Sequence, residues 1–429
     1  MFALVDGNSF YASCEAVFRP DIVNKPVVVL SNNDGCIVAA NAKAKAFGNI
    51  MYQPYFKLEK FLEQENTVVF SSNYELYGDL SHRMHTLLGT YATQQEIYSI
   101  DESFLDFSGM SRYDFTAYGS EIKQAVMKHL GLPVAVGIAS TKTLAKAANN
   151  IAKKNPELDH VLALSDLSVA DQNRFLSRMD VSDVWGVGRQ WSKRLKSMNI
   201  NTTLDLKRAS PKKIRKQFNV ILERTVLELN DTPCQDLELI IPHKQEIISS
   251  RAFSKTITDY QDMQQAVSRY IARAAEKLRK QGSTSKRITV AINTNPFQKN
   301  VVQYSNSSSI TLIYPSDNTS HLIDRGKQCL KQIWRNGCEY KKAMVILSDI
   351  SNRGVIQFDL FADKPRFSNN DKSEALMNVL DKINTRMGKG TCRMAAEGIN
   401  QKIDWSMKRL KHSPRYSTCW NELPVALIK

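Results

Sequence analysis

Short apolar runs alternate with amphipathic helical patterns along the first 165 residues. The apolar runs FALV, PVVVL and LPVAVGIA occupy 2–5, 26–30 and 132–139. Runs of this length predict buried strands, whereas apolar spacing of three to four residues predicts helices, here over 73–89, 115–130 and 141–154. Two β-prone stretches at 96–100 and 103–107 add a hairpin. The alternation predicts an α+β sheet domain over roughly the first 165 residues.

The pattern changes twice further along the chain. Residues 171–230 are predicted to be helical and basic, and NDTPCQDLELIIPHK (230–244) has the composition of a linker. From 246 to 350, four apolar strands and two helices predict a second, smaller α+β unit, in which YSNSSS (304–309) is predicted to be a loop. A final helical segment and a polar tail follow.

Composition excludes several classes of protein. With 42% hydrophobic residues the chain is typical of a globular protein, and no apolar run approaches the ~20 residues of a membrane-spanning helix. The N-terminus carries Asp6 and no basic residue before Arg19, unlike a signal peptide. The seven cysteines are scattered without a C-x-x-C pair, which argues against a disulfide framework and a zinc site. We therefore expect a cytoplasmic protein without a membrane segment.

The chain is strongly basic, with 58 Lys and Arg against 43 Asp and Glu and a formal charge of +15. Between 186 and 224 the excess is larger still, because Lys and Arg far outnumber the two acids, Asp205 and Glu223. A polyanion is the partner that such a segment favours. A solvated helical face is the alternative, which the sequence leaves open.

Three carboxylates follow predicted strands. Asp6 ends the first strand, and Asp101 and Glu102 lie side by side in the turn of the hairpin. They are either a solvated hairpin tip or acids that converge at one edge of a sheet. Converging carboxylates need a cation to offset their repulsion, and Mg²⁺ prefers such ligands. Two such ions are suited to phosphoryl transfer.

Several motifs resemble those of Y-family translesion DNA polymerases. VDGNSFYASCE, YSIDESFLDFSG and VAVGIASTKTLAKAANNIAKKN are similar, in order and separation, to the motifs of the polymerase palm. SNNDGCIVAANAKAKAFG, FSSNYELYGDLS, VWGVGRQWSKRL and SPRYSTCW resemble the UmuC branch, which contains the catalytic subunit of bacterial DNA polymerase V. The resemblance covers almost the whole chain, including a tail that shorter Y-family enzymes lack.

The resemblance implies roles for individual residues. The metal-binding, catalytic carboxylates would be Asp6, Asp101 and Glu102, with the main-chain carbonyl of Gly7 as a further ligand, for two Mg²⁺ ions. Tyr11 falls on the position of the steric gate against ribonucleotides, and Phe10 on its aromatic neighbour. Lys153 matches a lysine that binds the triphosphate. Without the resemblance, Phe10 and Tyr11 would be ordinary core aromatics at a helix start.

One motif departs from the wider family. Many Y-family polymerases carry N-Y-E-A-R in the fingers, where Tyr and Arg contact the incoming triphosphate. This chain has NAKAK, so Ala42 replaces the Tyr and Lys45 the Arg. Lys is a point charge without the guanidinium fork, which changes the grip on the triphosphate. Cys36 and Ile37 are expected over the nascent base pair, as a small roof.

DNA contacts are expected in two places. WGVG resembles a helix-hairpin-helix turn, in which main-chain N–H groups at a helix start hold a phosphate, although a plain helix-start turn is the alternative. The residues expected to contact DNA are Gly186, Val187, Gly188, Lys193, Arg194 and Lys196 in the helical segment, and Arg251, Lys255 and Arg287 in the second α+β unit.

The pentapeptide QFDLF resembles the short motif by which bacterial polymerases bind the sliding clamp. It comprises Gln357, Phe358, Asp359, Leu360 and Phe361. An amide anchor followed by Leu-Phe suits an apolar pocket on a partner. A buried strand is the alternative. Its position after the last predicted strand favours an exposed peptide.

The resemblance also implies an architecture. The expected fold is a right-hand polymerase with a ferredoxin-like palm, small fingers, a helical thumb and a separate α+β little finger. The boundaries are 1–30 and 77–168 for the palm, 31–76 for the fingers, 169–232 for the thumb, 243–350 for the little finger, 351–372 for a linker with the clamp peptide, and 373–429 for a UmuC-type tail.

The implied function is error-prone translesion synthesis in the bacterial SOS response. The expected partners are primer-template DNA, deoxynucleoside triphosphates, the sliding clamp, a processed UmuD-type dimer and a RecA filament on single-stranded DNA. A nucleotidyl cyclase, which also holds two metals on a palm-like sheet, is a weaker alternative because it has no use for the basic segment. A catalytically inactive DNA- and clamp-binding subunit is the other alternative.

Overall fold

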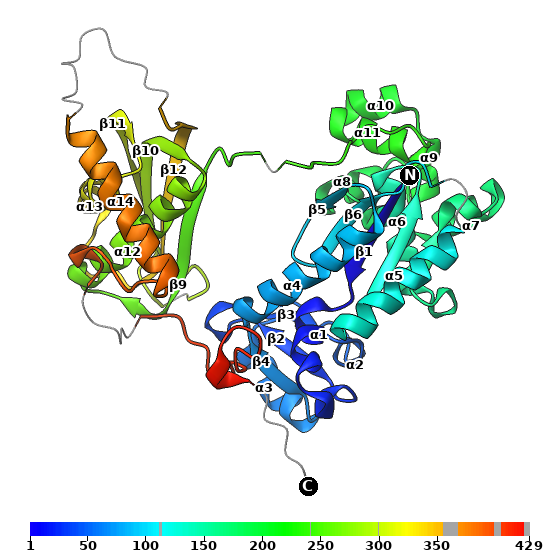
Figure 1. The fold of residues 1–429 in the computed structure, drawn as a ribbon, viewed down its shortest axis with the longest axis horizontal. Coiled ribbons are helices and arrows are strands. Elements are labelled where there is room, and N and C mark those ends of the chain that lie inside the picture. Colours follow the sequence, from blue (N-terminus) through cyan, green and yellow to red (C-terminus); the bar gives the residue numbers. More distant parts are fainter. Residues whose placement is uncertain (111–113, 241, 299, 355–367, 399–404, 424–429) are drawn as a thin grey trace. The chain divides into compact units, whose positions relative to one another are not determined.

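The chain folds into two compact units, which are described separately. The computed structural model describes residues 1–110, 114–240, 242–298, 300–354, 368–398 and 405–423. Unit 1 comprises Met1–Ile241 and Arg409–Lys429, and unit 2 comprises Pro242–Lys408 (Figure 1). The chain therefore leaves unit 1, forms unit 2 and returns to unit 1.

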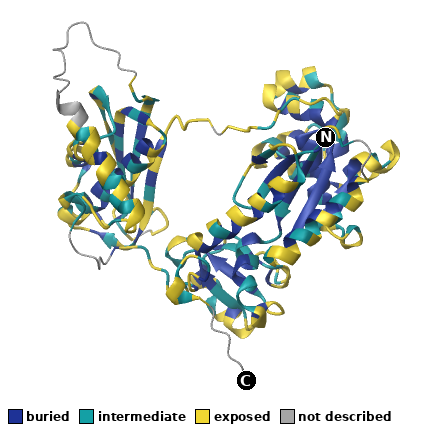
Figure 2. Cartoon of the chain, in the orientation of Figure 1, coloured by how far each residue is buried: buried dark blue, intermediate teal, exposed yellow. Residues whose placement is uncertain are grey.

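A five-stranded sheet forms the centre of unit 1. Its strands are β1 (Phe2–Gly7), β5 (Gln95–Ile97), β6 (Glu102–Asp106), β7 (Val134–Ala139) and β8 (Val161–Ala163), in the order β5-β6-β1-β7-β8. β1 pairs antiparallel with both β6 and β7. The apolar runs predicted at 2–5 and 132–139 are thus adjacent central strands, buried on both faces (Figure 2).

Alternation along β1 assigns its side chains to two cores. Ala3 and Val5 pack with the helices α1 (Phe10–Val17), α4 (Tyr74–Leu88) and α5 (Phe115–Leu130), whereas Leu4 faces α6 (Lys142–Lys154). Side chains in a strand point alternately to opposite faces of the sheet. One short apolar run therefore packs against the helices on both faces. Burial of a side chain the size of Val5 or Leu4 stabilises the fold by roughly 1.5–3 kcal/mol.

A small three-stranded sheet adjoins the central one. Its strands are β2 (Val27–Leu30), β3 (Ile37–Ala40) and β4 (Val68–Ser71), in the order β3-β2-β4, with the helices α2 (Ala42–Lys45) and α3 (Tyr55–Gln64). β2 is antiparallel to β3 and parallel to β4. β4 is therefore an edge strand whose outer side is open to a further segment.

Five short helices follow the central sheet: α7 (Val169–Arg178), α8 (Arg189–Lys196), α9 (Thr203–Arg208), α10 (Pro211–Gln217) and α11 (Val220–Leu229). Their apolar residues share one core with α6, including Leu195, Leu206 and Leu222. The basic segment predicted from the sequence is therefore a helical layer that packs on α6, with its charged residues outside.

Unit 2 is a four-stranded antiparallel sheet with helices on one face. The strands β9 (Ile247–Ile257), β10 (Ser283–Thr294), β11 (Ser305–Ser316) and β12 (Tyr340–Asn352) lie in the order β11-β10-β12-β9, and α12 (Tyr260–Lys280) and α13 (Thr319–Ile333) cover them. The serine-rich run predicted as a loop is instead the start of β11. It is an exposed edge strand, which needs few apolar side chains.

The residues predicted as the C-terminal tail are divided between the two units. The helix α14 (Ser368–Arg386) belongs to unit 2, where Asp381 pairs with Arg279 of α12, whereas the residues from Arg409 onward belong to unit 1. None of the seven cysteines is in a disulfide in the structure. Among the described residues, no helix combines the length and the apolar character needed to span a membrane.

Candidate active site

The strand register brings the predicted carboxylates to one edge of the central sheet. β1 and β6 pair so that Asp6 lies directly opposite Glu102. The main-chain N–H of Gly7 donates to the carbonyl oxygen of Asp101 at 2.8 Å. Asp101 is the last residue of the turn and Glu102 the first of the strand. The turn thus places Asp101 and Glu102 at the same end of the strand pair as Asp6.

The helix α6 passes closely over these strands because Gly137 has no side chain. A Cβ at Gly137 would clash with main-chain atoms of Ala145 and Asn149. The side-chain amide of Asn149 donates to the carbonyl oxygens of Leu4 and Ala135, at 3.3 and 2.8 Å, which fixes the helix on β1 and β7. Any larger residue than Gly at this position would push α6 away from the sheet.

Two lysines on one face of α6 meet the acids. Lys153 Nζ lies 2.6 Å from Asp6 Oδ2, and Lys146 Nζ lies 3.0 Å from Glu102 Oε1. The lysines are seven residues apart, which places them on the same helical face. The third acid, Asp101, accepts a hydrogen bond of 2.6 Å from Ser99 Oγ. Each carboxylate thus has a separate partner.

Burial makes the negative charge of Asp6 costly. The pKa of Asp6 is raised to about 6: removal from water raises it most, Lys153 opposes this, and the neighbouring Glu102 and Asp101 add smaller increases. A raised carboxyl pKa next to two other acids indicates a place where positive charge is in demand.

The donor atoms at this edge suit a hard divalent cation. In the part of the chain that the structure describes, no three His, Cys, Asp or Glu side chains are grouped closely enough to hold a metal ion. Asp6 and Glu102 are instead each paired with a lysine. The main chain nevertheless places three carboxylates and the Gly7 carbonyl around one strand pair, and oxygen donors of this kind fit Mg²⁺.

A pocket of about 390 Å³ lies beside the acids. Its lining includes Asp6, Gly7, Phe10, Tyr11, Val38, Ala39, Lys45, Asp101 and Lys153. Phe10 is almost fully buried, whereas Tyr11 is half-buried and faces the pocket. The ring of Tyr11 stacks on that of Tyr77 in α4, with 4.5 Å between centroids and 15° between planes. Tyr11 therefore has a rigid support behind it.

The three-stranded sheet supplies the opposite wall of this pocket. Lys45 Nζ donates to Ser9 Oγ at 3.0 Å, and burial followed by the nearby Lys153 lowers the pKa of Lys45. Val38 and Ala39 face the pocket, whereas Ile37 is fully buried in the core of the small sheet. Cys36 is half-buried at the start of β3 and lies outside the pocket lining. Neither Cys36 nor Ile37 thus lines this pocket, and their position over a base pair stays a prediction.

The glycine turn predicted to hold a phosphate precedes α8. Gly186 has φ +86°, and Gly188 caps the helix without a side-chain hydrogen bond. Val187 between them is buried in the core. Glycine adopts the left-handed conformation of Gly186 most easily, and no side chain caps the first N–H groups of α8.

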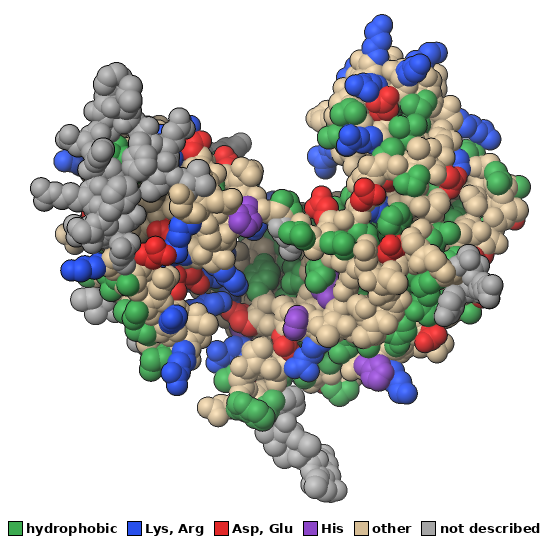
Figure 3. Space-filling model, turned by 45° about the horizontal axis from the view of Figure 1, so that its top comes forward, with side chains coloured by type: hydrophobic (Ala, Val, Ile, Leu, Met, Phe, Trp, Pro, Cys, Tyr) green, Lys and Arg blue, Asp and Glu red, His purple; other side chains and the backbone are tan. Residues whose placement is uncertain are grey.

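The predicted cations of α8 differ in their surroundings. Lys193 is exposed, the guanidinium of Arg194 lies 4.8 Å from the centre of the Phe218 ring, and Lys196 pairs with Asp180 at 2.8 Å. Further Lys and Arg side chains project from the outer helices of this segment (Figure 3). The segment is a basic surface in which Lys196 is already partly neutralised.

The predicted contacts in unit 2 lie on two strands of its sheet. Arg251 and Lys255 are exposed on β9. Arg287 is exposed on β10 and pairs with Asp349 at 3.4 Å. Its neighbour Ile288 is buried under the helices, so Arg287 points to the opposite, open face of the sheet. The predicted clamp peptide, Gln357–Phe361, lies outside the described residues.

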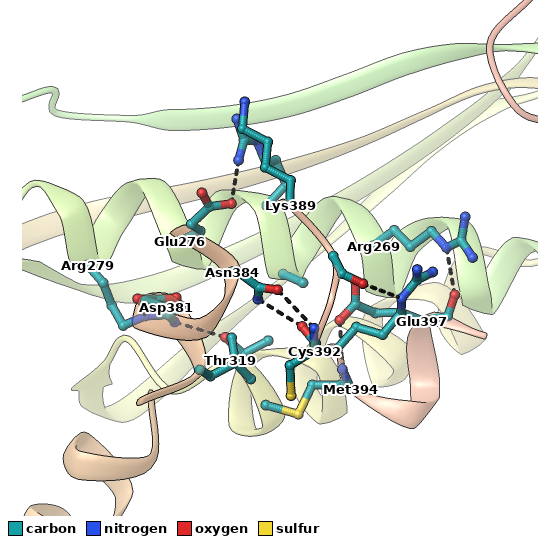
Figure 4. A pocket seen from close by; sticks show the side chains of 15 residues that line it. Arg269, Glu276, Arg279, Thr319, Asp381, Asn384, Lys389, Cys392, Met394 and Glu397 are labelled. Carbon is teal, nitrogen blue, oxygen red and sulfur yellow. Dashed lines mark hydrogen bonds and ion pairs between the residues drawn. The ribbon is translucent and has the colours of Figure 1, made fainter. Parts of the chain in front are cut away.

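Unit 2 also contains a charged pocket of about 420 Å³ against α12 (Figure 4). Two of its arginines are in ion pairs: Arg279 Nε lies 2.6 Å from Asp381 Oδ2, and Arg273 pairs with Glu276. Arg269 Nε donates to the main-chain carbonyl oxygen of Glu397 at 2.6 Å. None of the predicted site residues lines it. The pocket therefore lies between the α12 helix and the residues of α14 and the segment that follows it. It does not include the carboxylates of unit 1.

Three residues near the site were missed by sequence reasoning. Lys146 pairs with Glu102 and lies 4.4 Å from the centre of the Tyr98 ring. Ser99 holds Asp101, and Tyr77 supports Tyr11. The spacing of Lys146 and Lys153 is a signal that was available in the sequence. The stacking of Tyr77 on Tyr11 depends on how two distant helices pack and has no local signal.

Models of known protein families match most of the chain. Residues 5–150 match the impB/mucB/samB family and residues 244–360 match the C-terminal domain of that family. Residues 374–426 match a domain of unknown function, DUF4113. The chain is 49% identical to the protein UmuC of Salmonella typhimurium over 99% of each chain, and 44% identical to the protein MucB of Escherichia coli over the full length of both.

The fold is also that of solved structures. A chimeric Y-family DNA polymerase built from Dbh and Dpo4 aligns with a TM-score of 0.64 at 21% identity, over 82% of this chain and all of that one. An insertion ternary complex of the Dbh DNA polymerase aligns with a TM-score of 0.53 over the same shares. The predicted right-hand α+β polymerase fold with a separate C-terminal domain is therefore confirmed.

Fold and sequence together define the class: the protein is a Y-family DNA polymerase of translesion synthesis, an enzyme that depends on a divalent metal. Within that class the chain belongs to the impB/mucB/samB family, the UmuC branch. The resemblance inferred from the motifs is thus confirmed over the whole chain.

Proposed function

We propose that this polymerase performs template-directed, error-prone nucleotidyl transfer at the edge where β1 meets β6, with Asp6, Asp101 and Glu102 as metal ligands. The observation that carries the proposal is the strand register, which places Asp6 opposite Glu102. In addition, the main-chain N–H of Gly7 donates a hydrogen bond to the carbonyl oxygen of Asp101. The substrates are primer-template DNA and deoxynucleoside triphosphates, and the setting is the SOS response in the bacterial cytoplasm.

Two Mg²⁺ ions are the proposed cofactors, held by the three carboxylates and the Gly7 carbonyl. When bound, they would favour ionisation of the primer 3′-hydroxyl and offset charge on the leaving phosphate. Lys153 and Lys45 line the same pocket as Asp6. Two ammonium groups beside the acids suit a triphosphate, whose negative charge they offset while the nucleotide is oriented.

The ring of Tyr11 acts by exclusion. It faces the pocket from the first turn of α1, five residues after Asp6, and Tyr77 prevents it from moving back. A ribose 2′-hydroxyl would have to occupy space that the ring already fills. Val38 and Ala39, rather than Ile37, form the wall from the three-stranded sheet. Their small side chains leave room for a distorted template base.

A test of template direction separates this function from its alternatives. Four primer-templates that differ only in the next template base are incubated with each deoxynucleoside triphosphate, Mg²⁺ and the assembly that supports synthesis. We expect each template to direct addition of mainly its complement. A cyclic product without a template requirement would support the nucleotidyl cyclase, and no product with intact DNA binding would support the inactive subunit.

The basic helical segment should bind DNA through phosphates. We expect the logarithm of affinity for primer-template to fall steeply with the logarithm of salt concentration. The combined change Lys193→Gln, Arg194→Gln and Lys196→Gln should flatten the slope by about two units, because Lys196 is already paired with Asp180. Lys128→Gln on the exposed side of α5 is the control. An unchanged slope in the triple variant would indicate that the segment is a solvated helical face and does not bind DNA phosphates.

The proposed protein partners are the sliding clamp, a processed UmuD-type dimer and a RecA filament on single-stranded DNA. For the clamp, replacement of Gln357, Leu360 and Phe361 by Ala should abolish clamp binding and clamp-stimulated synthesis. Clamp-independent synthesis should be unchanged, because an exposed peptide contributes little to the fold. The melting temperature of the variant is the control, since a clear decrease would indicate a buried strand instead.

A further inference from the structure

The last part of the chain adds a segment to the open edge of the small sheet. The main-chain N–H of Ser71 in β4 donates to the carbonyl oxygen of Lys411 at 2.9 Å, and Lys411 N–H donates to Ser71 Oγ at 3.0 Å. His412 bridges Ser71 in parallel. Residues 409–416, here called the tail segment, thus lie beside β4 in unit 1 (Figure 1).

The tail segment continues into the junction between α1 and α4. The side-chain amide of Asn73, the cap of α4, donates to Ser413 Oγ at 2.9 Å and to the carbonyl oxygens of Ser413 and Pro414 at 3.2 Å. The Tyr416 ring stacks on Phe18 with centroids 4.8 Å apart. Asn73 and Ser413 are both buried. One amide therefore joins the start of α4 to the tail segment.

Ser413 also reaches a buried carboxylate. Glu15 in α1 is fully buried, and its Oε1 accepts hydrogen bonds from Ser413 Oγ at 3.0 Å and from the Tyr77 hydroxyl at 2.6 Å. Its Oε2 has no hydrogen-bond partner among the described residues. A buried acid with so few donors depends on each of them. Ser413 is the donor that comes from the tail segment.

The same tyrosine supports the sugar-facing ring. Tyr77 is fully buried, its hydroxyl is fixed by Glu15, and its ring stacks on Tyr11. The contacts form a continuous series from Ser413 through Glu15 and Tyr77 to Tyr11. Three contacts thus connect the tail segment to the ring that faces the pocket.

We propose that the tail segment is a specificity element: Ser413 positions Tyr11, through Glu15 and Tyr77, and so sets the selection of deoxyribonucleotides. The inference rests on the proposed role of Tyr11 at the pocket. It gives the end of the DUF4113 match a function within the same chain. Ser413, Glu15 and Tyr77 are positioning residues, because none of them lines the pocket.

The experiment compares three variants of the full chain in the assembly that supports synthesis. Tyr77→Phe removes the hydroxyl and keeps the ring, Ser413→Ala removes the donor from the tail segment, and Ser413→Thr restores a hydroxyl. The measurement is the ratio of kcat/KM for ribonucleotide to kcat/KM for deoxyribonucleotide incorporation. We expect the ratio to rise about tenfold in Tyr77→Phe and Ser413→Ala, and to stay near the wild-type value in Ser413→Thr.

Ser417→Ala is the matched control, because Ser417 directly follows the tail segment. Its hydroxyl is buried and has no hydrogen-bond partner among the described residues. Its ratio should not change. A second control places Ser413→Ala in a Tyr11→Ala background, where it should add nothing to the ratio because the two changes act through one ring.

Two results would overturn the inference. The first is an unchanged ratio in both variants, as would occur if Tyr77→Phe and Ser413→Ala lowered the activity toward both nucleotides equally. The second is an effect of Ser413→Ala that persists in the Tyr11→Ala background. If the wild-type assembly shows no template-directed incorporation, the proposed function fails instead, and the two failures are thereby distinguished.

Discussion

Asp101→Asn is expected to lower the rate of nucleotide addition by about three orders of magnitude or more, while affinity for primer-template changes little. Loss of a metal ligand removes several kcal/mol of transition-state stabilisation, and each 1.4 kcal/mol is about tenfold in rate. Asn keeps an oxygen that can accept the hydrogen bond from Ser99, so the turn is preserved. Single-turnover incorporation and fluorescence anisotropy measure the two quantities.

The same strand offers a matched control for this change. Asp106 ends β6, lies opposite Phe2 at the far end of β1, and accepts a hydrogen bond from the N–H of Ser108. Asp106→Asn should leave the rate near the wild-type value. A near wild-type rate in Asp101→Asn would show that Asp101 is not a metal ligand of the active site.

Tyr11→Ala is expected to raise the ratio of ribonucleotide to deoxyribonucleotide incorporation by about two orders of magnitude, because the space filled by the ring becomes available to the 2′-hydroxyl. Tyr11→Phe should keep most of the exclusion, since the ring rather than its hydroxyl is the barrier. The ratio of kcat/KM for the two nucleotides measures the effect. An active Tyr11→Ala enzyme with an unchanged ratio would make Tyr11 an ordinary core aromatic.

Phe10→Ala separates sugar selection from packing. Phe10 is 3% exposed and belongs to the core of α1, β1 and α4. Its replacement should lower the free energy of unfolding by about 3–5 kcal/mol, as measured by denaturant unfolding, with a much smaller effect on the ratio than Tyr11→Ala. The neighbouring aromatics thus have distinct expected phenotypes.

The parts of the site that follow from local patterns were predictable from the sequence. A short apolar run ending in Asp6, a hairpin with Asp101 in its turn and a helix carrying Lys153 are all encoded within a few residues. The structure adds the register, which decides that Asp6 faces Glu102. Ile37 could not be placed by pattern alone, because which residues of a four-residue strand face a pocket depends on the sheet it joins.

Contacts between distant parts of the chain were not predictable. Asn73 and Ser413 are 340 residues apart, and no periodicity or composition marks their pairing. The division of the tail is a second example: α14 belongs to unit 2, and the residues from Arg409 onward belong to unit 1. The start of β11 was predicted as a loop because serine and asparagine favour turns, whereas an exposed edge strand tolerates them.

The most direct test of the central claim is primer extension past an abasic site in the template. The full chain is assayed with Mg²⁺, and the clamp, the UmuD-type dimer and the RecA filament are added in turn, beside the Asp101→Asn chain. We expect the complete wild-type assembly to extend primers beyond the abasic site and the Asp101→Asn assembly not to do so. Equal extension by both assemblies would contradict the central claim, because synthesis would then not depend on the carboxylates at this sheet edge.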